Sequence, residues 1–141
     1  MKKGDIIILV SLFAIILVGF FVYYLVVKTD SNTIEIVVKN EIVETTTLNN
    51  DATYKIYSSE DLEDIYVYKD DELIKTINYK HSIAISNTIQ IKDKTVNMID
   101  ANCNTKDCMK MYINESHKMP IICTNGVEVR VIENNEVDVT T

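Results

Sequence analysis

The sequence predicts a mainly β protein, a small antiparallel β-barrel or sandwich that follows one N-terminal transmembrane helix. One observation behind this prediction is an uncharged apolar stretch near the N-terminus. Another is a remainder rich in Ile, Val, Thr, Tyr and Asn, with only 3 Gly and 1 Pro in the whole chain, a composition that favours strands. We therefore divide the chain into a cytoplasmic N-terminus (1–5), a transmembrane helix (6–27), a linker (28–32) and an extracytoplasmic β domain (33–141).

The apolar stretch is long enough to cross a lipid bilayer. Ile6–Val27 contains 22 residues and no charged side chain, and at about 1.5 Å per residue a helix of this length spans about 33 Å. A cleaved signal peptide is the alternative, but its apolar region is shorter and ends in small residues. Here the far end carries the bulky residues Phe20, Phe21, Tyr23 and Tyr24. The sequence predicts an uncleaved anchor whose partner is the lipid bilayer, through residues 6–27.

The charges on either side of the anchor predict its orientation. Lys2 and Lys3 precede it, together with Asp5, whereas Lys28 and Asp30 follow it. Because the more positive flank of a membrane helix usually stays in the cytoplasm, the N-terminus is expected inside. The protein is therefore predicted to be a single-pass protein of the cell membrane with its C-terminal domain outside.

The part of the chain after the anchor is acidic. Residues 31–141 carry 11 Lys and Arg against 19 Asp and Glu, which gives a formal charge of 11 − 19 = −8. Such a domain repels phosphate backbones, so we expect no nucleic-acid partner. The sequence also lacks the glycine-rich motifs G-x-x-x-x-G-K-[ST] and G-x-G-x-x-G of phosphate-binding loops.

Short β-branched and aromatic runs, separated by turn residues, predict strands in the first half of the outer domain. These strands are Thr33–Lys39, Ile42–Thr47, Ala52–Tyr57, Ile65–Tyr68 and Leu73–Tyr79. Turns are expected at Asn40–Glu41 and in the acidic segment Lys69–Glu72. The charged segment Ser58–Asp64 is expected to hold one helical turn capped by Ser59.

The same pattern continues in the second half of the outer domain. The predicted strands are Ser82–Ser86, Thr88–Ile91, Thr95–Ile99, Pro120–Cys123 and Val127–Ile132. Thr124–Asn125–Gly126 joins the last two, and its Asn-Gly pair supplies the positive φ angles of a tight hairpin turn. Since a closed barrel and a pair of packed sheets both leave few open edges, we predict one of these two arrangements.

Three cysteines, Cys103, Cys108 and Cys123, lie in the last third of the chain with the spacing C-x4-C-x14-C. Together with His117 they could complete a tetrahedral zinc site, but structural zinc sites usually show closer pairs such as C-x2-C. Outside the cytoplasm a disulfide is favoured. We therefore predict one disulfide and no metal.

Loop closure distinguishes the possible disulfide pairings. A Cys103–Cys108 bridge removes little chain entropy, whereas a bridge from either residue to Cys123 closes about 15 to 20 residues and contributes about 3 kcal/mol. Cys108 leads into the segment that must return beside the Cys123 strand. We predict a disulfide between Cys108 and Cys123 and a free thiol at Cys103.

The cysteine-containing region resembles a known family. Asn87–Cys108 reads NTIQIKDKTVNMIDANCNTKDC and is followed by Ile121–Cys123 and the strand Val127–Ile132. With the anchor, this pattern is similar to the membrane-anchored NusG domain II-containing proteins, in which a strand pair ends in A-D-C-P-D-K-x-C and the last strand follows I-x-C-L-P-N-x-V-x-I. Here Ala101–Cys108 reads A-N-C-N-T-K-D-C, with Asn104 at the position of the family's Pro. The resemblance implies a compact β fold of the NusG domain II type, but no role in transcription.

Residues 62–86 have two open interpretations. They are additional material relative to the family pattern, or they belong to the second copy of a repeated strand–turn–strand unit. The stretches IVVKNEIVETTTL, which begins at Ile36, and IYVYKDDELIKTI, which begins at Ile65, look like variants of one such unit.

The sequence offers little for catalysis. Its two histidines, His81 and His117, lie in polar stretches, where a solvated imidazole without a catalytic role is expected. We therefore predict no enzyme activity and no cofactor. The leading hypothesis is a membrane-tethered, extracytoplasmic, non-enzymatic interaction or accessory module with a protein partner of unknown identity.

The alternative hypothesis is a thiol-disulfide or electron-transfer accessory protein that uses Cys103, Cys108 and Cys123. Lys106 and Lys110 flank Cys108, and nearby cations lower the pKa of a thiol and so increase its reactivity. An accessible, rapidly alkylated thiol would favour this hypothesis, whereas buried or paired cysteines would favour a structural role.

Overall fold

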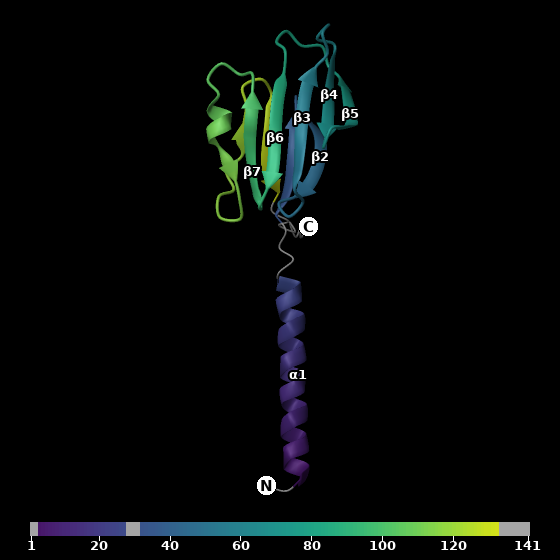
Figure 1. Cartoon of the computed structure of the whole chain (residues 1–141), viewed down its shortest axis with the longest axis vertical. Coiled ribbons are helices and arrows are strands. Elements are labelled where there is room, and N and C mark those ends of the chain that lie inside the picture. Colours follow the sequence, from purple (N-terminus) through teal and green to yellow (C-terminus); the bar gives the residue numbers. More distant parts are fainter. Residues whose placement is uncertain (1–2, 28–31, 133–141) are drawn as a thin grey trace, which may run out of the picture. The chain divides into compact units, whose positions relative to one another are not determined.

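The computed structural model describes residues 3–27 and 32–132 (Figure 1). It contains two compact units, Met1–Ser31 and Asn32–Thr141, which are described separately below. Most of the predicted linker at 28–32 lies outside the described residues. The same is true of the start of the predicted cytoplasmic N-terminus and of the predicted β domain beyond residue 132.

The first unit is one long apolar helix, α1 (Lys3–Val27). The segment Gly4–Leu25 has a mean hydropathy of 3.0, and none of its residues is buried. Ser11, a polar residue within it, donates its hydroxyl to the carbonyl oxygen of Ile8 at 2.9 Å, which satisfies the side chain inside the helix. By length and composition, α1 is a single membrane span or a signal sequence.

The second unit consists of two open antiparallel sheets. The smaller sheet has the order β2-β1-β10-β9, and the larger has the order β5-β4-β3-β6-β7-β8. Figure 1 shows the larger sheet with β5, β4, β3, β6 and β7 labelled side by side. The strands are β1 (Thr33–Val38), β2 (Glu41–Thr47), β3 (Ala52–Ser58), β4 (Asp64–Lys69), β5 (Glu72–Asn78), β6 (Ser86–Lys92), β7 (Thr95–Ala101), β8 (Tyr112–Ile113), β9 (Ile121–Ile122) and β10 (Val127–Ile132).

Both sheets contribute to a single hydrophobic core. Ile36 and Val129 from the smaller sheet belong to the same buried cluster as Ile56 and Ile89 from the larger one. In β3, buried and half-buried residues alternate from Ala52 to Ile56, as expected for a strand with one face on the core. Two packed sheets therefore form a sandwich, and residues 32–132 form no closed barrel.

Three hairpins have two-residue turns in which both central residues have positive φ angles. The turns are Lys39–Asn40 between β1 and β2, Asp70–Asp71 between β4 and β5, and Asp93–Lys94 between β6 and β7. Positive φ at both central positions is the signature of a type I′ turn. None of the six is glycine, and Asn and Asp tolerate this conformation better than other residues. The turn predicted within Lys69–Glu72 is confirmed, whereas the one predicted at Asn40–Glu41 lies one residue earlier, because Glu41 already belongs to β2.

The segment Ser58–Asp64 contains no helical turn, so that prediction is wrong. The Ser59 hydroxyl accepts hydrogen bonds from the backbone N–H groups of Glu63 (3.2 Å) and Asp64 (2.9 Å). Leu62 has a φ of 61°, which no α-helix contains. The serine therefore caps a non-helical turn that leads directly into β4.

The predicted strand Ser82–Ser86 is also absent, because β6 begins only at Ser86. β6 then continues through Asn87, where the sequence had suggested a break between two strands. The short 3-10 helix η1 (Asp107–Lys110) and the two-residue strand β8 were not predicted.

The hairpins β1–β2 and β4–β5 share a second feature. In each, the strand after the turn carries one extra, bulged residue at the third position past the turn, Val43 in β2 and Ile74 in β5. The hairpin β6–β7 also has a bulge, but it lies farther from the turn, at Ile99. The shared turn and bulge support the interpretation of residues 62–86 as part of a repeated hairpin unit.

Candidate functional site

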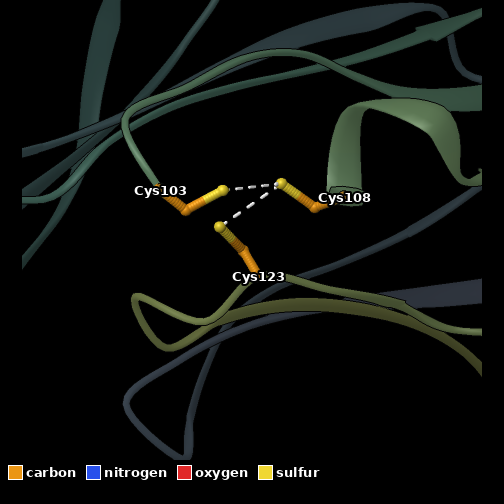
Figure 2. Close-up of side chains that lie close together, drawn as sticks. All are labelled: Cys103, Cys108 and Cys123. Carbon is orange, nitrogen blue, oxygen red and sulfur yellow. Dashed lines mark hydrogen bonds between the residues drawn. The ribbon is translucent and has the colours of Figure 1, made fainter. Parts of the chain in front are cut away.

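Three chain segments bring the cysteines together (Figure 2). Cys103 follows the end of β7 in the larger sheet, Cys108 lies in η1, and Cys123 follows β9 in the smaller sheet. The three side chains point toward one another. The cysteine cluster, defined as Cys103, Cys108 and Cys123, therefore connects the ends of both sheets.

The sulfur atoms form a tight triangle. Cys108 Sγ lies 3.4 Å from Cys103 Sγ and 3.4 Å from Cys123 Sγ, and all three sulfurs lie within 4.8 Å of one another. The three residues are free thiols with exposed fractions of 7%, 2% and 3% in chain order. The cluster is thus a group of three thiols buried inside the fold.

Local backbone geometry sets the position of Cys108. Lys106 has a φ of 53°, a left-handed conformation that reverses the chain before η1. The N–H of Met109 then donates to the carbonyl oxygen of Lys106 at 3.1 Å, and the ion pair between Lys110 and Asp107 (3.1 Å) spans the 3-10 turn. Together these contacts direct the side chain of Cys108 inward.

A hairpin turn sets the position of Cys123. The N–H of Gly126 donates to the Cys123 carbonyl oxygen at 3.0 Å, and the Cys123 N–H donates to the carbonyl oxygen of Val127 at 2.8 Å. Within the predicted Asn-Gly turn only Gly126 has a positive φ, 97°. A left-handed residue closing a three-residue hairpin loop is a common turn geometry, so the predicted turn is present with one positive φ instead of two.

Three asparagines form a hydrogen-bond network beside the cluster. The side-chain amide of Asn125 donates to the side-chain oxygens of Asn87 and Asn102, the latter at 3.0 Å. Asn102 also accepts from the N–H of Ser86 (3.1 Å) and donates to the carbonyl oxygen of Ala84 (2.6 Å). Because Asn87 and Asn125 are buried, these bonds offset the cost of removing their amides from water.

The surroundings shift the pKa values of Cys108 and Cys123 in opposite directions. Burial, together with hydrogen bonds to Cys123 and Cys103, raises the pKa of the Cys108 thiol to about 12. Burial also acts to raise the pKa of Cys123, but hydrogen bonds from the Asn125 backbone and the Asn87 side chain, and then from the two thiols, bring it below its usual value. Of these two, Cys123 is therefore the sulfur better suited to carry negative charge.

The predicted site residues are therefore close in space. Cys108 and Cys123 are neighbours, as their predicted pairing requires, but Cys103 is equally near Cys108. His117 does not belong to the group of potential metal ligands among the described residues; its ring packs against Tyr112, with ring centroids 4.7 Å apart. Among the described residues, the zinc site considered from the sequence thus lacks His117 as its fourth ligand.

The asparagine network was missed in the sequence. Asn87, Asn102 and Asn125 are ordinary turn-favouring residues by type, and only the fold reveals that they converge. The available signal was Asn87 itself, a polar residue between β-branched runs at a position that faces the core in the strand.

Comparisons with known proteins support one relationship. The profile of the NusG domain II family matches residues 6–135, from the start of the apolar stretch to beyond β10. Searches of curated proteins and of solved structures find no match. Since the family match covers most of the 141 residues, the chain belongs to the NusG domain II family.

Proposed function

We propose that the chain is a non-enzymatic interaction or accessory module, tethered to the cell membrane by residues 6–27 with its β domain on the outer side. The observation that carries this proposal is the exposure of the apolar segment Gly4–Leu25 of α1, in which no residue is buried. An exposed apolar surface of this length is unfavourable in water, and a bilayer is the environment that it fits. The greater positive charge before the helix supports a cytoplasmic N-terminus.

A surface on the β domain supports the interaction part of the proposal. β2 and β5 are edge strands of the two sheets, and the side chain of Lys75 on β5 joins them, since its Nζ donates to the Ile42 carbonyl oxygen at 3.0 Å. Beside this contact Ile42, Leu73 and Ile74 have exposed fractions of 44%, 50% and 38%. Neighbouring exposed apolar residues of this kind are typical of protein contact surfaces.

Site-specific photo-cross-linking in living cells tests this proposal. A photoreactive amino acid at Leu73 should give a cross-linked adduct with one protein partner. The same amino acid at Ile99 is the matched control, because Ile99 is also an exposed aliphatic residue but lies on β7, which β4, β3 and β6 separate from β5 in the sheet order. Absence of an adduct at Leu73, or equal adducts at both positions, would contradict the proposal.

A second candidate is a thiol-disulfide accessory function. The burial of all three cysteines favours a structural role, but the distances between their sulfur atoms support this candidate. Cys108 lies 3.4 Å from Cys123, and a disulfide requires a sulfur separation of about 2.05 Å, so a small side-chain movement suffices. Cys123 also has a lowered pKa, which favours the thiolate that attacks in disulfide exchange. In this candidate Cys108 and Cys123 form the disulfide and Cys103 keeps a free thiol.

Peptide mapping without reduction tests the second candidate. Protein taken from its native compartment should yield a linked peptide pair containing Cys108 and Cys123, and an alkylated Cys103. A bridge between Cys103 and Cys108, or three alkylated cysteines, would rule out this pairing.

A further inference from the structure

We propose that the reduced cysteine cluster is a three-coordinate site for a monovalent copper ion, with Cys103, Cys108 and Cys123 as ligands. This inference depends neither on the membrane tether nor on a protein partner. It concerns the reduced form of the cluster, since a disulfide would remove two of the three ligands.

The size of the sulfur triangle fits one shared ion. Three sulfurs bound in one plane to a central ion, at the usual metal–sulfur distance of about 2.3 Å, lie about 4.0 Å apart. Two sulfur separations in the cluster are 3.4 Å and the third is within 4.8 Å. Shifts of a few tenths of an ångström in the side chains, about the size of ordinary thermal displacements, bring all three sulfurs to bonding distance from a central ion.

The same triangle is poorly arranged for transfer of a disulfide within the cluster. A thiolate that attacks a disulfide must approach nearly in line with the bond that breaks. With sides of 3.4 Å, 3.4 Å and at most 4.8 Å, the angle at Cys108 Sγ is no wider than a right angle. The arrangement therefore favours joint coordination over sulfur-to-sulfur exchange.

The ligand set selects copper over zinc. Thiolates are soft ligands that bind monovalent copper well, whereas structural zinc almost always has four ligands. The described residues provide three sulfurs and no fourth ligand of the usual types within the group. Each cysteine is more than nine-tenths buried, so water has little access to complete a tetrahedral site.

The surroundings of the cluster hold one sulfur ready for coordination. The Asn125 backbone and the Asn87 side chain donate hydrogen bonds to Cys123, and Asn87 is itself oriented by its bond from Asn125. Such outer contacts orient a ligand and stabilise its charged form. Coordination replaces the S–H bond of each ligating thiol with a sulfur–copper bond and releases the proton to solvent. The ion stays monovalent, so the step needs no oxidant or reductant.

Anaerobic titration of the reduced full-length chain in detergent tests the site. Monovalent copper, buffered by a competing chelator, should bind with one equivalent per chain and produce an ultraviolet thiolate-to-copper charge-transfer band. X-ray absorption of this complex should show three sulfur neighbours around copper. A hundredfold excess of zinc should leave the band unchanged.

Variants locate the site within the fold. Cys103→Ser, Cys108→Ser and Cys123→Ser should each weaken copper binding at least about a hundredfold, because each removes a direct ligand. Ile122→Ala is the matched control, since Ile122 adjoins Cys123 but is exposed, and it should bind copper as the unmodified chain does. Circular dichroism checks that each variant remains folded.

Several results would overturn the inference. They are an absence of copper binding, displacement of copper by zinc, two sulfur neighbours in the X-ray absorption spectrum, or undiminished binding in any folded serine variant. The X-ray absorption result on the unmodified chain decides the matter even if a serine variant fails to fold.

Discussion

At the residue scale, Asn87 contributes both to the packing of the core and to the environment of the Cys123 thiol. Its side chain is completely buried in β6, where it accepts a hydrogen bond from Asn125 and donates one to the sulfur of Met98 at 3.4 Å. It also donates to Cys123 and helps to lower the pKa of that thiol. One amide therefore connects the interior of the larger sheet to the hairpin that carries Cys123.

Replacement of Asn87 should reveal this role. Asn87→Ala leaves the buried amide of Asn125 without one of its acceptors, so the free energy of unfolding should fall by about 1–3 kcal/mol. Asn97→Ala is the control, because Asn97 is a half-buried asparagine on the adjacent strand β7, and its loss should stay within about 0.5 kcal/mol. Urea denaturation measures both, and equal losses would contradict the proposed importance of the network.

The turn at Ser59 gives a prediction about pH. A hydrogen bond from the Ser59 hydroxyl, and then one from the Glu63 N–H, lowers the pKa of the Asp61 carboxyl below 3.8. Because the folded state favours the carboxylate, this contribution to stability is present above the unfolded pKa and is lost as pH falls through the lower folded value. Ser59→Ala should return the Asp61 pKa toward 3.8 in an NMR titration. An unchanged pKa in that variant would show that the hydroxyl is not the cause.

At the scale of elements, local sequence patterns predicted the strands but not all their ends. Val127–Ile132 was predicted with its observed bounds, because its apolar residues alternate and a turn signal precedes it. The predicted break at Asn87 was wrong. An asparagine usually marks a turn, but here partners distant in sequence, among them Asn125, satisfy its side chain inside a strand. β8 depends on the pairing of Val96 with Ile113, a contact that no local pattern encodes.

In the candidate site, too, local sequence patterns predicted some features, whereas others depend on contacts and turns that no local pattern encodes. The spacing of the three cysteines indicated that Cys108 and Cys123 could meet, since the chain between them must return. Cys103 joins them because the left-handed turn at Lys106 reverses the chain, and Lys is not a residue that signals such a turn.

The type I′ turns yield a test of backbone strain. Asn40 has a φ of 68° in the turn between β1 and β2, a conformation that disfavours β-branched residues. Asn40→Val should lower the free energy of unfolding by about 1–2 kcal/mol, whereas Asn40→Gly should leave it within about 0.5 kcal/mol. Thermal denaturation compares the two variants, and equal stability would be incompatible with a left-handed residue at this position.

The pairing of β1 with β10 yields another test. Arg130 donates from Nε (2.9 Å) and Nη2 (2.8 Å) to one carboxylate oxygen of Glu35, a residue that lies opposite it in the register. Since Glu35 is buried, Arg130→Met should cost about 1–3 kcal/mol by leaving the carboxylate unpaired. Adding Glu35→Gln should recover part of this loss.

An exposed ion pair provides the control for that double-mutant cycle. Lys94 and Glu115 are 3.0 Å apart, with side-chain exposures of 57% and 60%, and their coupling energy should stay below about 0.5 kcal/mol. A Glu35–Arg130 coupling no larger than this would contradict a structural role for this partly buried pair.

At the scale of the whole molecule, the protein consists of two units with opposite surface chemistry, the apolar helix α1 and the β domain. α1 exposes a continuous apolar surface, whereas the β domain buries apolar residues from both of its sheets in one core. The first and last strands of the described residues, β1 and β10, pair along their full lengths. This pairing holds the two ends of the β domain together. A tethered module requires two such units, because the apolar helix suits a bilayer and the β domain has a hydrophobic core of its own.

Cleavage of the tether in intact spheroplasts tests the central claim most directly. A recognition sequence for a site-specific protease is inserted after Asp30, and the chain carries different epitope tags at its two ends. Protease added outside should release the C-terminal tag in a soluble fragment, while the N-terminal tag remains in the membrane fraction and resists general proteolysis until lysis. If the tether is cut only after lysis, or if the β domain is already soluble without protease, the proposed tether and orientation are wrong.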